Sequence, residues 1–408
     1  QLSDYSLTQS RLGLLPSINA STNYSFNFGR TLDPTTYRYV NQNTQYNTFS
    51  VTGNWDIFNG LQRQNTIKQN QYTLLANQYN TENTTNTVLL YVAGGFLDIV
   101  YGEENLKNAD DLLKISQLQL DRTKLLVDAG TLAQGSLYDI EAQVARDELN
   151  KVTAQNTLDL AKLNLEQLLN LTEPIEVSVP SINMTSEILN QLNITVDSIY
   201  RVALETQPNI KSAKYNMMSS EKGIAIARGA QLPSLSLYGS LSTNYSNVQQ
   251  LSGGDTVVGA PTQIGYVEGS LTPVLAPNVS FIPAFGTEAF GKQFSNNFGQ
   301  SFGLSLNIPI FNNWQARTNI SRSKINMLNA QYNYESVRQT LLKDIQSAYA
   351  DAVAAKNSYE AAVKGVTSLE KAFDDAQKKF NLGAITSLDY TTAQSNLAKA
   401  QSYVLQSK

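Results

Sequence analysis

Trp55-Asp56-Ile57-Phe58-Asn59 and Ile308-Pro309-Ile310-Phe311-Asn312 are two versions of one stretch of sequence, 253 residues apart. The same offset holds at further positions downstream: Gln78-Tyr79-Asn80 with Gln331-Tyr332-Asn333, Glu82 with Glu335, Asp98 with Asp351, Asp121 with Asp374, and Gly130 with Gly383. Upstream, Leu15-Pro16-Ser17 recurs as Leu232-Pro233-Ser234. Copies of this length are too long for a short-period repeat protein. They indicate an internally duplicated chain, and each copy contains a strand, a loop, a strand, a very long helix and a return helix.

The composition excludes several classes of protein. The 408 residues carry a net charge of −4 and include neither cysteine nor histidine. A nucleic-acid-binding protein would carry a basic surface, and disulfides, thiol nucleophiles and the usual zinc sites need the two missing residue types. We therefore expect no cofactor, no metal and no nucleic-acid partner. The sequence also lacks any run of about 18 apolar residues that would encode a transmembrane helix.

Four segments alternate between apolar positions and positions rich in Ser and Asn. In residues 17–28 one face carries Ile18, Ala20, Thr22, Tyr24, Phe26 and Phe28, and the other carries only Ser and Asn. The pattern returns in residues 48–57, 234–245 and 297–310. It predicts half-buried strands, which a soluble β-sandwich would also contain. Strands of about 11 residues, tilted by about 40°, span roughly 28 Å, which matches the apolar band of an outer-membrane barrel with a watery lumen.

Aromatic side chains lie at the ends of these segments. Trp55, Phe58, Phe311 and Trp314 lie at one end, and we expect them at the membrane interface, where aromatic girdles form. The connecting loops are long: residues 29–46 join the first two strands, and residues 246–296, rich in Gly and Pro, join the second two. A structureless loop of that length is unusual in a compact soluble domain. It is typical of the external face of an outer-membrane barrel.

Two stretches, residues 61–129 and 314–382, contain no proline. Each corresponds to roughly 100 Å of helix. Both carry a heptad: Val92, Ile99, Leu106, Leu113, Leu120 and Val127 in the first, and Ile345, Ala352, Tyr359, Val366, Phe373 and Phe380 in the second. Spacing by seven predicts left-handed supercoiling against a neighbouring helix. Gly130 and Gly383 end the helices, and helix resumes about six residues later, so we expect two antiparallel helical hairpins.

These signals divide the chain into seven parts. Residues 1–16 end a first helix, 17–58 form β-hairpin 1, 59–171 form the helical hairpin of the first copy, 172–207 form an equatorial insert, 208–231 form a helix leading to the barrel, 232–311 form β-hairpin 2 with its long external loop, and 312–408 form the incomplete helical hairpin of the second copy.

Four strands of membrane length cannot stand alone in lipid, because both edges of their sheet would carry unpaired backbone groups. Strands from other copies of the chain must close the sheet. Eight strands from two copies would leave an interior filled by side chains, whereas twelve from three copies leave room for a pore. We therefore predict a mixed α+β membrane protein: a homotrimer with a trimeric 12-stranded β-barrel, four strands per chain, continued by a long antiparallel α-helical coiled-coil barrel.

The chain resembles the TolC-like outer-membrane efflux proteins, the outer membrane factors of tripartite export systems. The resemblance covers essentially the whole chain and is carried by these motifs: Leu14-Leu15-Pro16-Ser17, Gln231-Leu232-Pro233-Ser234, Pro309-Ile310-Phe311, Val127-Asp128-Ala129-Gly130-Thr131-Leu132, Phe380-Asn381-Leu382-Gly383-Ala384-Ile385-Thr386, Asp389 and Ala393-Gln394. It implies an exit duct in the outer membrane of a Gram-negative bacterium, exporting small molecules or polypeptides, with its helical part in the periplasm. It also implies a periplasmic adaptor protein and an inner-membrane pump or ABC exporter as partners, and no catalysis.

The resemblance implies site residues as well. The helical turns would form a periplasmic tip where adaptors dock: Gly130, Thr131, Leu132, Ala133, Gly383, Ala384, Ile385 and Thr386. Asp389 matches one acidic position of the family's pore constriction, whereas Thr392 and Ile385 occupy the places of a second acid and of an arginine. An apolar seal by Phe380 and Ile385 is the alternative constriction. The alternative role of Asp389 is to compensate the positive end of a helix dipole.

Two other functions compete with export. An enzyme could use the paired acids Glu103-Glu104, Asp110-Asp111 and Asp374-Asp375. Adjacent residues on a helix point about 100° apart, however, so these pairs do not converge on one substrate and are better explained as solvated surface. A structural periplasmic or surface coiled-coil protein without a transport role would explain the heptads but not the four alternating strands. Such a protein would not need detergent to stay in solution.

We expect that Gln1 and Lys408 are not the natural ends of the protein. The second copy has over 20 helical residues before Leu232-Pro233, whereas the first has about 14 before Leu15-Pro16. The return helix of the second copy is also shorter, at about 25 residues against about 35. The missing parts would be a signal sequence with half a helix in front, and further helix behind. A mass spectrum of the native protein at 44.9 kDa would contradict this expectation.

Overall fold

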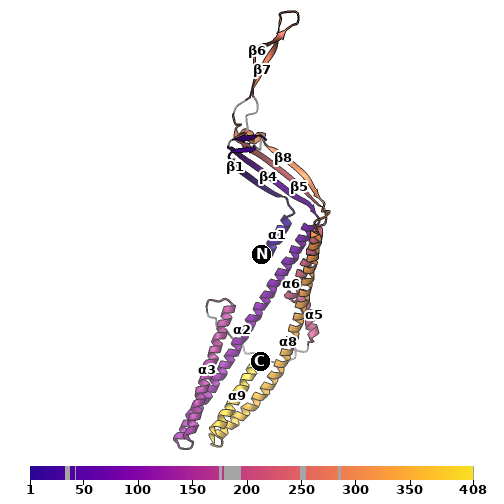
Figure 1. Ribbon diagram of the computed structural model, residues 1–408. Helices are drawn as coiled ribbons and strands as arrows, with labels where there is room; N and C mark the ends of the chain where they lie inside the picture. Colours follow the sequence, from indigo (N-terminus) through magenta and orange to yellow (C-terminus); the bar gives the residue numbers. More distant parts are fainter. Residues whose placement is uncertain are drawn as a thin grey trace. The chain divides into compact units, whose positions relative to one another are not determined.

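The computed structural model describes residues 1–32, 37–41, 43–173, 177–178, 194–248, 254–283 and 286–407. The chain forms two compact units. The first consists of Gln1–Leu74 and Met218–Leu328 and contains a β-sheet, and the second consists of Leu75–Met217 and Asn329–Lys408 and contains long helices (Figure 1). Both copies of the duplicated sequence contribute to both units.

The sheet of the first unit has the strand order β1-β4-β5-β8, with every neighbouring pair antiparallel. Its strands are β1 (Ser17–Asn27), β4 (Thr44–Asn59), β5 (Ser234–Ser246) and β8 (Gly299–Asn307). Helix α1 (Leu2–Leu12) leads into β1, and α6 (Pro208–Gly229) leads into β5. Each copy thus supplies one hairpin, the two hairpins join along β4 and β5, and β1 and β8 are the edges (Figure 1).

The strand register aligns the alternating patterns of all four strands. Asn19, Thr52, Ser240 and Ser301 form one row across the sheet. The neighbouring row on the opposite face consists of Ala20, Val51, Leu241 and Gln300. Because side chains alternate between the faces of a sheet, one face is built mainly from Ser, Thr and Asn and the other mainly from apolar side chains. Both faces run unbroken from one edge strand to the other.

The connections between the strands contain secondary structure that the sequence did not reveal. Residues 246–296 are not a structureless loop: they include β6 (Gly254–Tyr266) and β7 (Pro273–Pro283), which pair with each other, and α7 (Phe290–Asn296). The first connection contains the short pair β2 (Arg30–Leu32) and β3 (Tyr39–Asn41). A ladder between β6 and β7 satisfies the backbone groups of a long external segment, which explains how it can extend without a core of its own.

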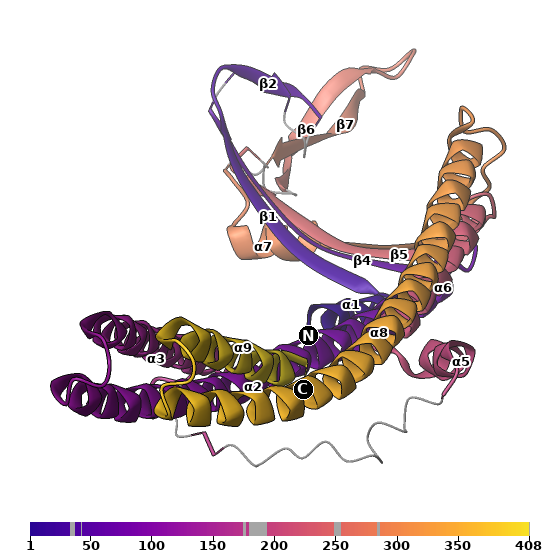
Figure 2. The same cartoon turned by 90° about the horizontal axis from the view of Figure 1, so that it is seen from below.

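Helix α7 covers part of the apolar face of the sheet. Its Phe294 ring lies 5.5 Å from the Phe49 ring, and its Phe290 ring lies 5.3 Å from that of Tyr245, so α7 packs on the apolar face. Gln293 is fully buried and anchors the helix, because its side chain accepts from the backbone N–H of Ser246 and donates to the carbonyl of Ser246. In Figure 2 the strands form an arc with α7 on its convex side, so the polar face is concave.

Two details of the strands differ from expectation. The alternation predicted a strand through Ile310, but β8 ends at Asn307, whose partner Ser234 is the first residue of β5. Pro309 has no N–H to donate, so it cannot continue a ladder. In β4, the register shifts between Asp56 and Phe58, which is a β-bulge next to the start of the following helix. Bulges of this kind bend a strand at the rim of a sheet.

The turns from strand to helix have similar backbone conformations in the two copies of the duplicated sequence. Gly60 and Leu61 after β4 have φ of +66° and +62°, and Asn313 and Trp314, their counterparts in the second copy, have φ of 50° and 66°. At Gly60 the backbone also touches the end of α6, since a Cβ there would lie 2.2 Å from the carbonyl oxygen of Gly229. This contact leaves no room for a side chain at either glycine.

The helical unit contains two hairpins (Figures 1 and 2). The first is formed by α2 (Gln62–Asp128) and α3 (Gln134–Leu168), and the second by α8 (Gln315–Asn381) and α9 (Ser387–Ser407). The two proline-free stretches are thus continuous helices of 67 residues each, whose first turns belong to the sheet unit. The short helix α5 (Val196–Thr206) precedes α6. Residues 174–176 and 179–193 of the expected equatorial insert, 172–207, lie outside the described residues.

The heptad positions lie at the helix contacts. Ile99 is fully buried and packs with Leu158 and Leu165 of α3. Further along, Leu120 of the same heptad packs against Ile140 of α3 and Phe373 of α8, in a core shared by both hairpins. This burial is what seven-residue spacing predicts for supercoiled helices.

Among the described residues, no helix has the length and apolarity needed to cross a membrane.

The close approach of two glycines gives a first prediction. Gly60→Ala places a methyl group against the Gly229 carbonyl, so we expect a loss of about 3 kcal/mol or more of stability. Gly130→Ala is the matched control, because Gly130 has a similar φ of +73° but nothing within 4 Å of an added Cβ, and it should cost only about 1–2 kcal/mol of backbone strain. Thermal unfolding in detergent, followed by circular dichroism, should rank the variants in that order. Equal melting temperatures would contradict it.

Candidate functional site: the turns of the helical hairpins

The turns at residues 130–133 and 383–386 have the same backbone design. Gly130 and Gly383 take the left-handed conformation, with φ of +73° and +71°. In the first turn the N–H of Thr131 donates to the carbonyl of Leu126 over 2.9 Å, and in the second the N–H of Ala384 donates to that of Lys379 over 2.9 Å. This six-to-one bond is the Schellman motif, which satisfies carbonyls that a helix end leaves unpaired. The exposed residues of each turn therefore need no partner for the turn to form.

The return helices begin differently in the two copies. Ala133 caps α3 without any side-chain hydrogen bond. At the start of α9 the Thr386 hydroxyl accepts from the N–H of Asp389 over 3.2 Å, and the Asp389 carboxylate accepts from the Thr386 N–H over 3.1 Å and from its hydroxyl over 2.7 Å. This reciprocal pair is a capping box. The hydrogen bonds from Thr386 hold the pKa of Asp389 below its usual value.

Phe380 lies away from any open surface of the turn. Its ring is 2% exposed and stacks on Tyr390 with centroids 5.1 Å apart. Ile140, Phe373 and Leu397 complete this core, against which the half-buried Ile385 packs. Burial raises the pKa of Tyr390 to about 12. Phe380 was expected to seal a pore, but in this chain it holds the two hairpins together.

A buried polar cluster, which the sequence reading missed, lies behind that core. Gln394 is 1% exposed and donates over 2.8 Å to the Ser116 hydroxyl, which in turn donates to the carboxylate of Asp147. Gln143 donates to the same carboxylate over 3.0 Å. Three helices, α2, α3 and α9, are thereby joined through side chains that are at most 8% exposed. These hydrogen bonds fix how the three helices align, and among the described residues the Gln394 side-chain oxygen is left buried without a hydrogen-bond partner.

Two of the three acidic pairs, Asp110-Asp111 and Asp374-Asp375, form ion pairs with lysines on the helix surfaces. Asp110 lies 2.6 Å from Lys114 and 2.6 Å from Lys151, and hydrogen bonds from these two lysines lower its pKa to about 2. Asp374 and Asp375 pair with lysines one turn further on in α8, at Lys378 and Lys379. An acid this strongly ionised cannot donate a proton at neutral pH. In the part of the chain that the structure describes, no cluster of three or more acids could hold a metal ion.

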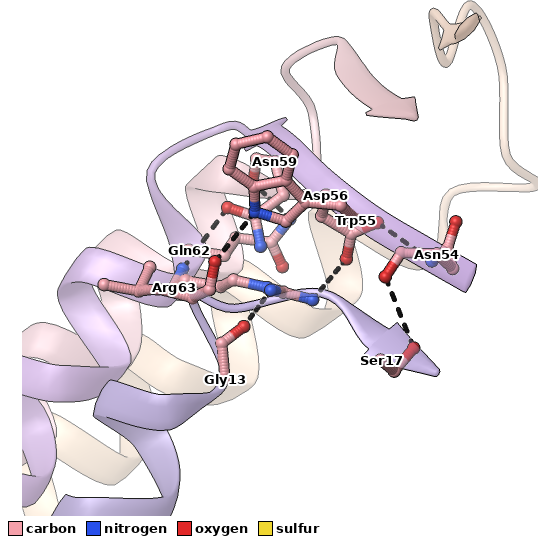
Figure 3. Close-up of polar contacts among 9 residues, drawn as sticks. Gly13, Ser17, Asn54, Trp55, Asp56, Asn59, Gln62 and Arg63 are labelled. Atoms are coloured by element: carbon pink, nitrogen blue, oxygen red, sulfur yellow. Dashed lines mark hydrogen bonds and ion pairs between the residues drawn. The ribbon is translucent and has the colours of Figure 1, made fainter. Parts of the chain in front are cut away.

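The expected interfacial aromatics lie where strands give way to helices, and all four are exposed. In the first copy the Trp55 indole N–H donates over 2.8 Å to the carbonyl of Leu14. Figure 3 shows Arg63 beside it, reaching the carboxylate of Asp56 and the carbonyl of Gly13. These contacts fasten the end of α1 to the start of α2.

The second copy lacks this set of contacts. Pro309 and Ala316 take the places of Asp56 and Arg63. A cavity of about 300 Å³ remains there, lined by Pro309, Phe311, Trp314 and Arg317 among others. The Arg317 guanidinium instead lies 4.3 Å from the centre of the Trp314 ring, a cation–π contact. The two strand-to-helix junctions therefore share a backbone and differ in side-chain chemistry.

Comparison with known proteins assigns the chain to a family. A family model described as outer membrane efflux protein matches residues 1–171 and 199–408. Outer membrane efflux protein BepC of Brucella suis biovar 1 is 22% identical over 375 residues, which cover 90% of this chain and 70% of BepC. Outer membrane protein TolC of Escherichia coli K12 is 22% identical over 405 residues, 97% of this chain and 72% of TolC.

Solved structures agree on the fold. VceC of Vibrio cholerae superimposes with a TM-score of 0.75 at 14% identity, over 99% of this chain and 86% of VceC. The CmeC outer membrane channel of Campylobacter jejuni gives 0.74 at 16% identity, over 100% of this chain and 77% of CmeC.

The buried polar cluster gives a second prediction. Gln394→Ala removes the donor to Ser116 and should cost about 1–2 kcal/mol, which loosens α9 and speeds its amide exchange by about tenfold. Asn396→Ala, two residues away and exposed, is the matched control and should leave exchange unchanged. Hydrogen exchange read by mass spectrometry on α9 peptides makes the comparison. Equal protection in both variants would show that the cluster does not hold the hairpins.

Proposed function

The chain belongs to the outer membrane efflux protein family, and on this basis we propose that three copies form one export duct. Members of this family are outer-membrane exit channels of tripartite efflux systems in Gram-negative bacteria, and they are not enzymes. Their fold is α+β with a helical barrel. The trimer, its twelve strands and its partners are our proposal for this protein.

The proposal of a trimeric duct rests on the two faces and the two edges of the sheet. Its convex apolar face suits lipid, its concave face of Ser, Thr and Asn suits a watery lumen, and both faces end at unpaired edge strands. Closing the sheet with strands from two further copies pairs every edge, which a lipid environment demands. Twelve strands leave a lumen wide enough for a pore, whereas eight would be filled by side chains.

The hairpin turns are the proposed docking surface for a periplasmic adaptor, which would connect the duct to an inner-membrane pump or ABC exporter. The surface consists of Gly130, Thr131, Leu132, Ala133, Gly383, Ala384, Ile385 and Thr386. It is supported by the Schellman bonds, in which donors and acceptors are backbone groups, and by the exposure of Ala133 and Ala384. The exposed side chains of Ala133 and Ala384 are free to contact a partner.

We propose Asp389 and Ile385 as the narrow end of the duct, with Phe380 behind them as packing. Three-fold symmetry would bring three exposed Asp389 carboxylates together. The hydrogen bonds from Thr386 keep the pKa of each carboxyl low, so the group is ionised at neutral pH. A ring of like charges in a confined pore attracts cations and favours their passage.

The docking surface can be tested by substitution. Ala133→Glu and Ala384→Glu place a charge on an exposed turn, so each should abolish export while leaving a detergent-stable trimer. Ala354→Glu, at an exposed position in the middle of α8, is the control and should retain export. Export in cells and size-exclusion chromatography with light scattering provide the two readouts. Loss of the trimer in the turn variants would mean that the turns are structural, and would overturn the assignment.

The acidic ring has its own test. Asp389→Asn removes the charge, so reversal potentials in a salt gradient across planar bilayers should show reduced cation selectivity, most at low salt, where screening is weakest. Thr386→Val removes the hydroxyl of the capping box but keeps the carboxylate, so its selectivity should stay close to that of the unmodified protein. If both variants leave the reversal potential unchanged, Asp389 only starts the helix and Ile385 is left as the constriction.

A further inference from the structure

The cavity at the second strand-to-helix junction has the composition of an anion site. It has a volume of about 300 Å³, and eight side chains line it. Three of them can donate hydrogen bonds: Gln231, Asn312 and Arg317. The other five are apolar, and none of the eight is Asp or Glu. A negatively charged ligand would therefore meet hydrogen-bond donors and one positive charge in this cavity, without repulsion from a carboxylate.

Among the described residues, Arg317 has no acidic partner. Its guanidinium lies 4.3 Å from the centre of the Trp314 ring. Stacking on an aromatic ring uses the flat face of a guanidinium and leaves the N–H groups at its edge free to donate. Arg63 at the first junction is instead held by Asp56 and by the carbonyl of Gly13 (Figure 3). Of these two arginines, Arg317 is therefore the one that is available to a ligand from outside the chain.

Two side-chain amides of the cavity are available as well. The Asn312 side-chain oxygen accepts from the N–H of Ala316 over 3.4 Å, which leaves the NH2 group of Asn312 to donate elsewhere. Within the part of the chain that the structure describes, the side chain of Gln231 forms no hydrogen bond. The cavity thus offers two neutral donors beside one positive charge. Charge-assisted and neutral hydrogen bonds from such a set suit the oxygens of a phosphate group.

Apolar side chains beside the cavity stay accessible when neighbouring elements are in place. In the first copy, α6 ends against the turn that begins α2. Even so, Phe58 and Leu61, the counterparts of Phe311 and Trp314, are 39% and 50% exposed. Phe311 and Trp314 themselves are 75% and 59% exposed. A neighbouring copy in the duct would therefore still leave an aromatic surface next to the cavity.

Phosphate-binding groups next to exposed aromatic side chains suit a lipid headgroup better than a soluble anion. In the duct proposed above, this junction lies where the sheet ends and the periplasmic helices begin, at the inner leaflet of the outer membrane. Aromatic side chains gather at such interfaces, and basic residues there bind lipid headgroups. We propose that the cavity binds the phosphate of an anionic glycerophospholipid of the inner leaflet through Arg317, Gln231 and Asn312. Phe311 and Trp314 then contact its glycerol and acyl chains. The site rests on the proposed function, because it requires the sheet to lie in a membrane.

The composition of the cavity also predicts which headgroup is preferred. Phosphatidylethanolamine carries an ammonium group, whereas phosphatidylglycerol carries no positive charge. Because no acid lines the cavity, the ammonium group would lie near the Arg317 guanidinium without a counter-charge, and like charges repel. Phosphatidylglycerol should therefore bind more tightly than phosphatidylethanolamine.

Native mass spectrometry of the protein in detergent tests the site, because it counts the lipids bound to each oligomer. The probes are phosphatidylglycerol, phosphatidylethanolamine and diacylglycerol with identical acyl chains. Phosphatidylglycerol should bind about fivefold more tightly than phosphatidylethanolamine, and diacylglycerol, which lacks the phosphate, should bind most weakly. Arg317→Gln should weaken the binding of phosphatidylglycerol about fivefold. Glycerol 3-phosphate, which has the phosphate but no acyl chains, should not displace the lipid at an equal concentration.

Arg322→Gln is the matched control for the arginine. Arg322 is exposed and lies on the same helix, five residues beyond Arg317. It therefore points about 140° away around the helix. Arg322→Gln removes the same charge from α8, so it should bind phosphatidylglycerol as the unmodified protein does.

The outcomes separate the lipid site from the duct. Trimers that bind phosphatidylglycerol equally well with and without Arg317→Gln would overturn the site and leave the proposed function standing. Displacement of the lipid by an equal concentration of glycerol 3-phosphate would also overturn it, since the site would then take a free anion. A protein that is monomeric and stays in solution without detergent would overturn both proposals. Weaker binding by Arg317→Gln, with Arg322→Gln unchanged, would establish the site.

Discussion

The ladder between β4 and β5 is the constraint on which the sheet unit depends. It is the junction of the two duplicated hairpins, and it extends from Asn59 and Ser234, past the bulge next to Asp56, to Tyr46 and Ser246 at the far end. Below it, the backbones of Gly60 and Gly229 touch, so α2 and α6 leave the sheet next to each other. Thr73 and Ser219 then join these two helices through a 2.9 Å hydroxyl pair. The polar and apolar faces are continuous only because this ladder holds its register.

Much of this fold could be predicted from local pattern. Period-two alternation located β1, β4, β5 and most of β8, and the absence of proline located α2 and α8, because these signals reside in consecutive residues. The left-handed glycines at Gly130 and Gly383 were equally local. The pair β6–β7 was missed, because its Gly and Pro residues are typical of loops, and the strands are stabilised by each other rather than by a core. The end of β8 was missed because it depends on where its partner strand begins.

The site was less predictable than the fold. Asp389 and Thr386 form a capping box that their spacing contains, and the exposed turns follow from the glycines. Phe380 could not be placed, because a heptad position is buried against whichever helix lies beside it, and here that environment includes Tyr390 of the return helix. Ser116 and Asp147 are of residue types usually found on surfaces. Nothing in their spacing indicates that Gln394 meets them from a distant part of the chain.

The buried polar cluster makes the halves of this molecule unequal. Adding the offset of 253 to Ser116, Gln119 and Thr123 of α2 gives Leu369, Ala372 and Ala376 of α8, so these polar positions of the first long helix have apolar counterparts on the second. In the return helices Ala142-Gln143 corresponds to Ala393-Gln394, so both halves carry the amide, and Gln394 of the second half donates to Ser116 of the first. A synthetic gene made by fusing the second half to itself would therefore encode a mismatched core: two copies of the Gln394 amide, with Leu369 in the place of the Ser116 hydroxyl that receives it. The two halves have diverged since the duplication. They now pack against each other through different side chains, although their backbones remain similar.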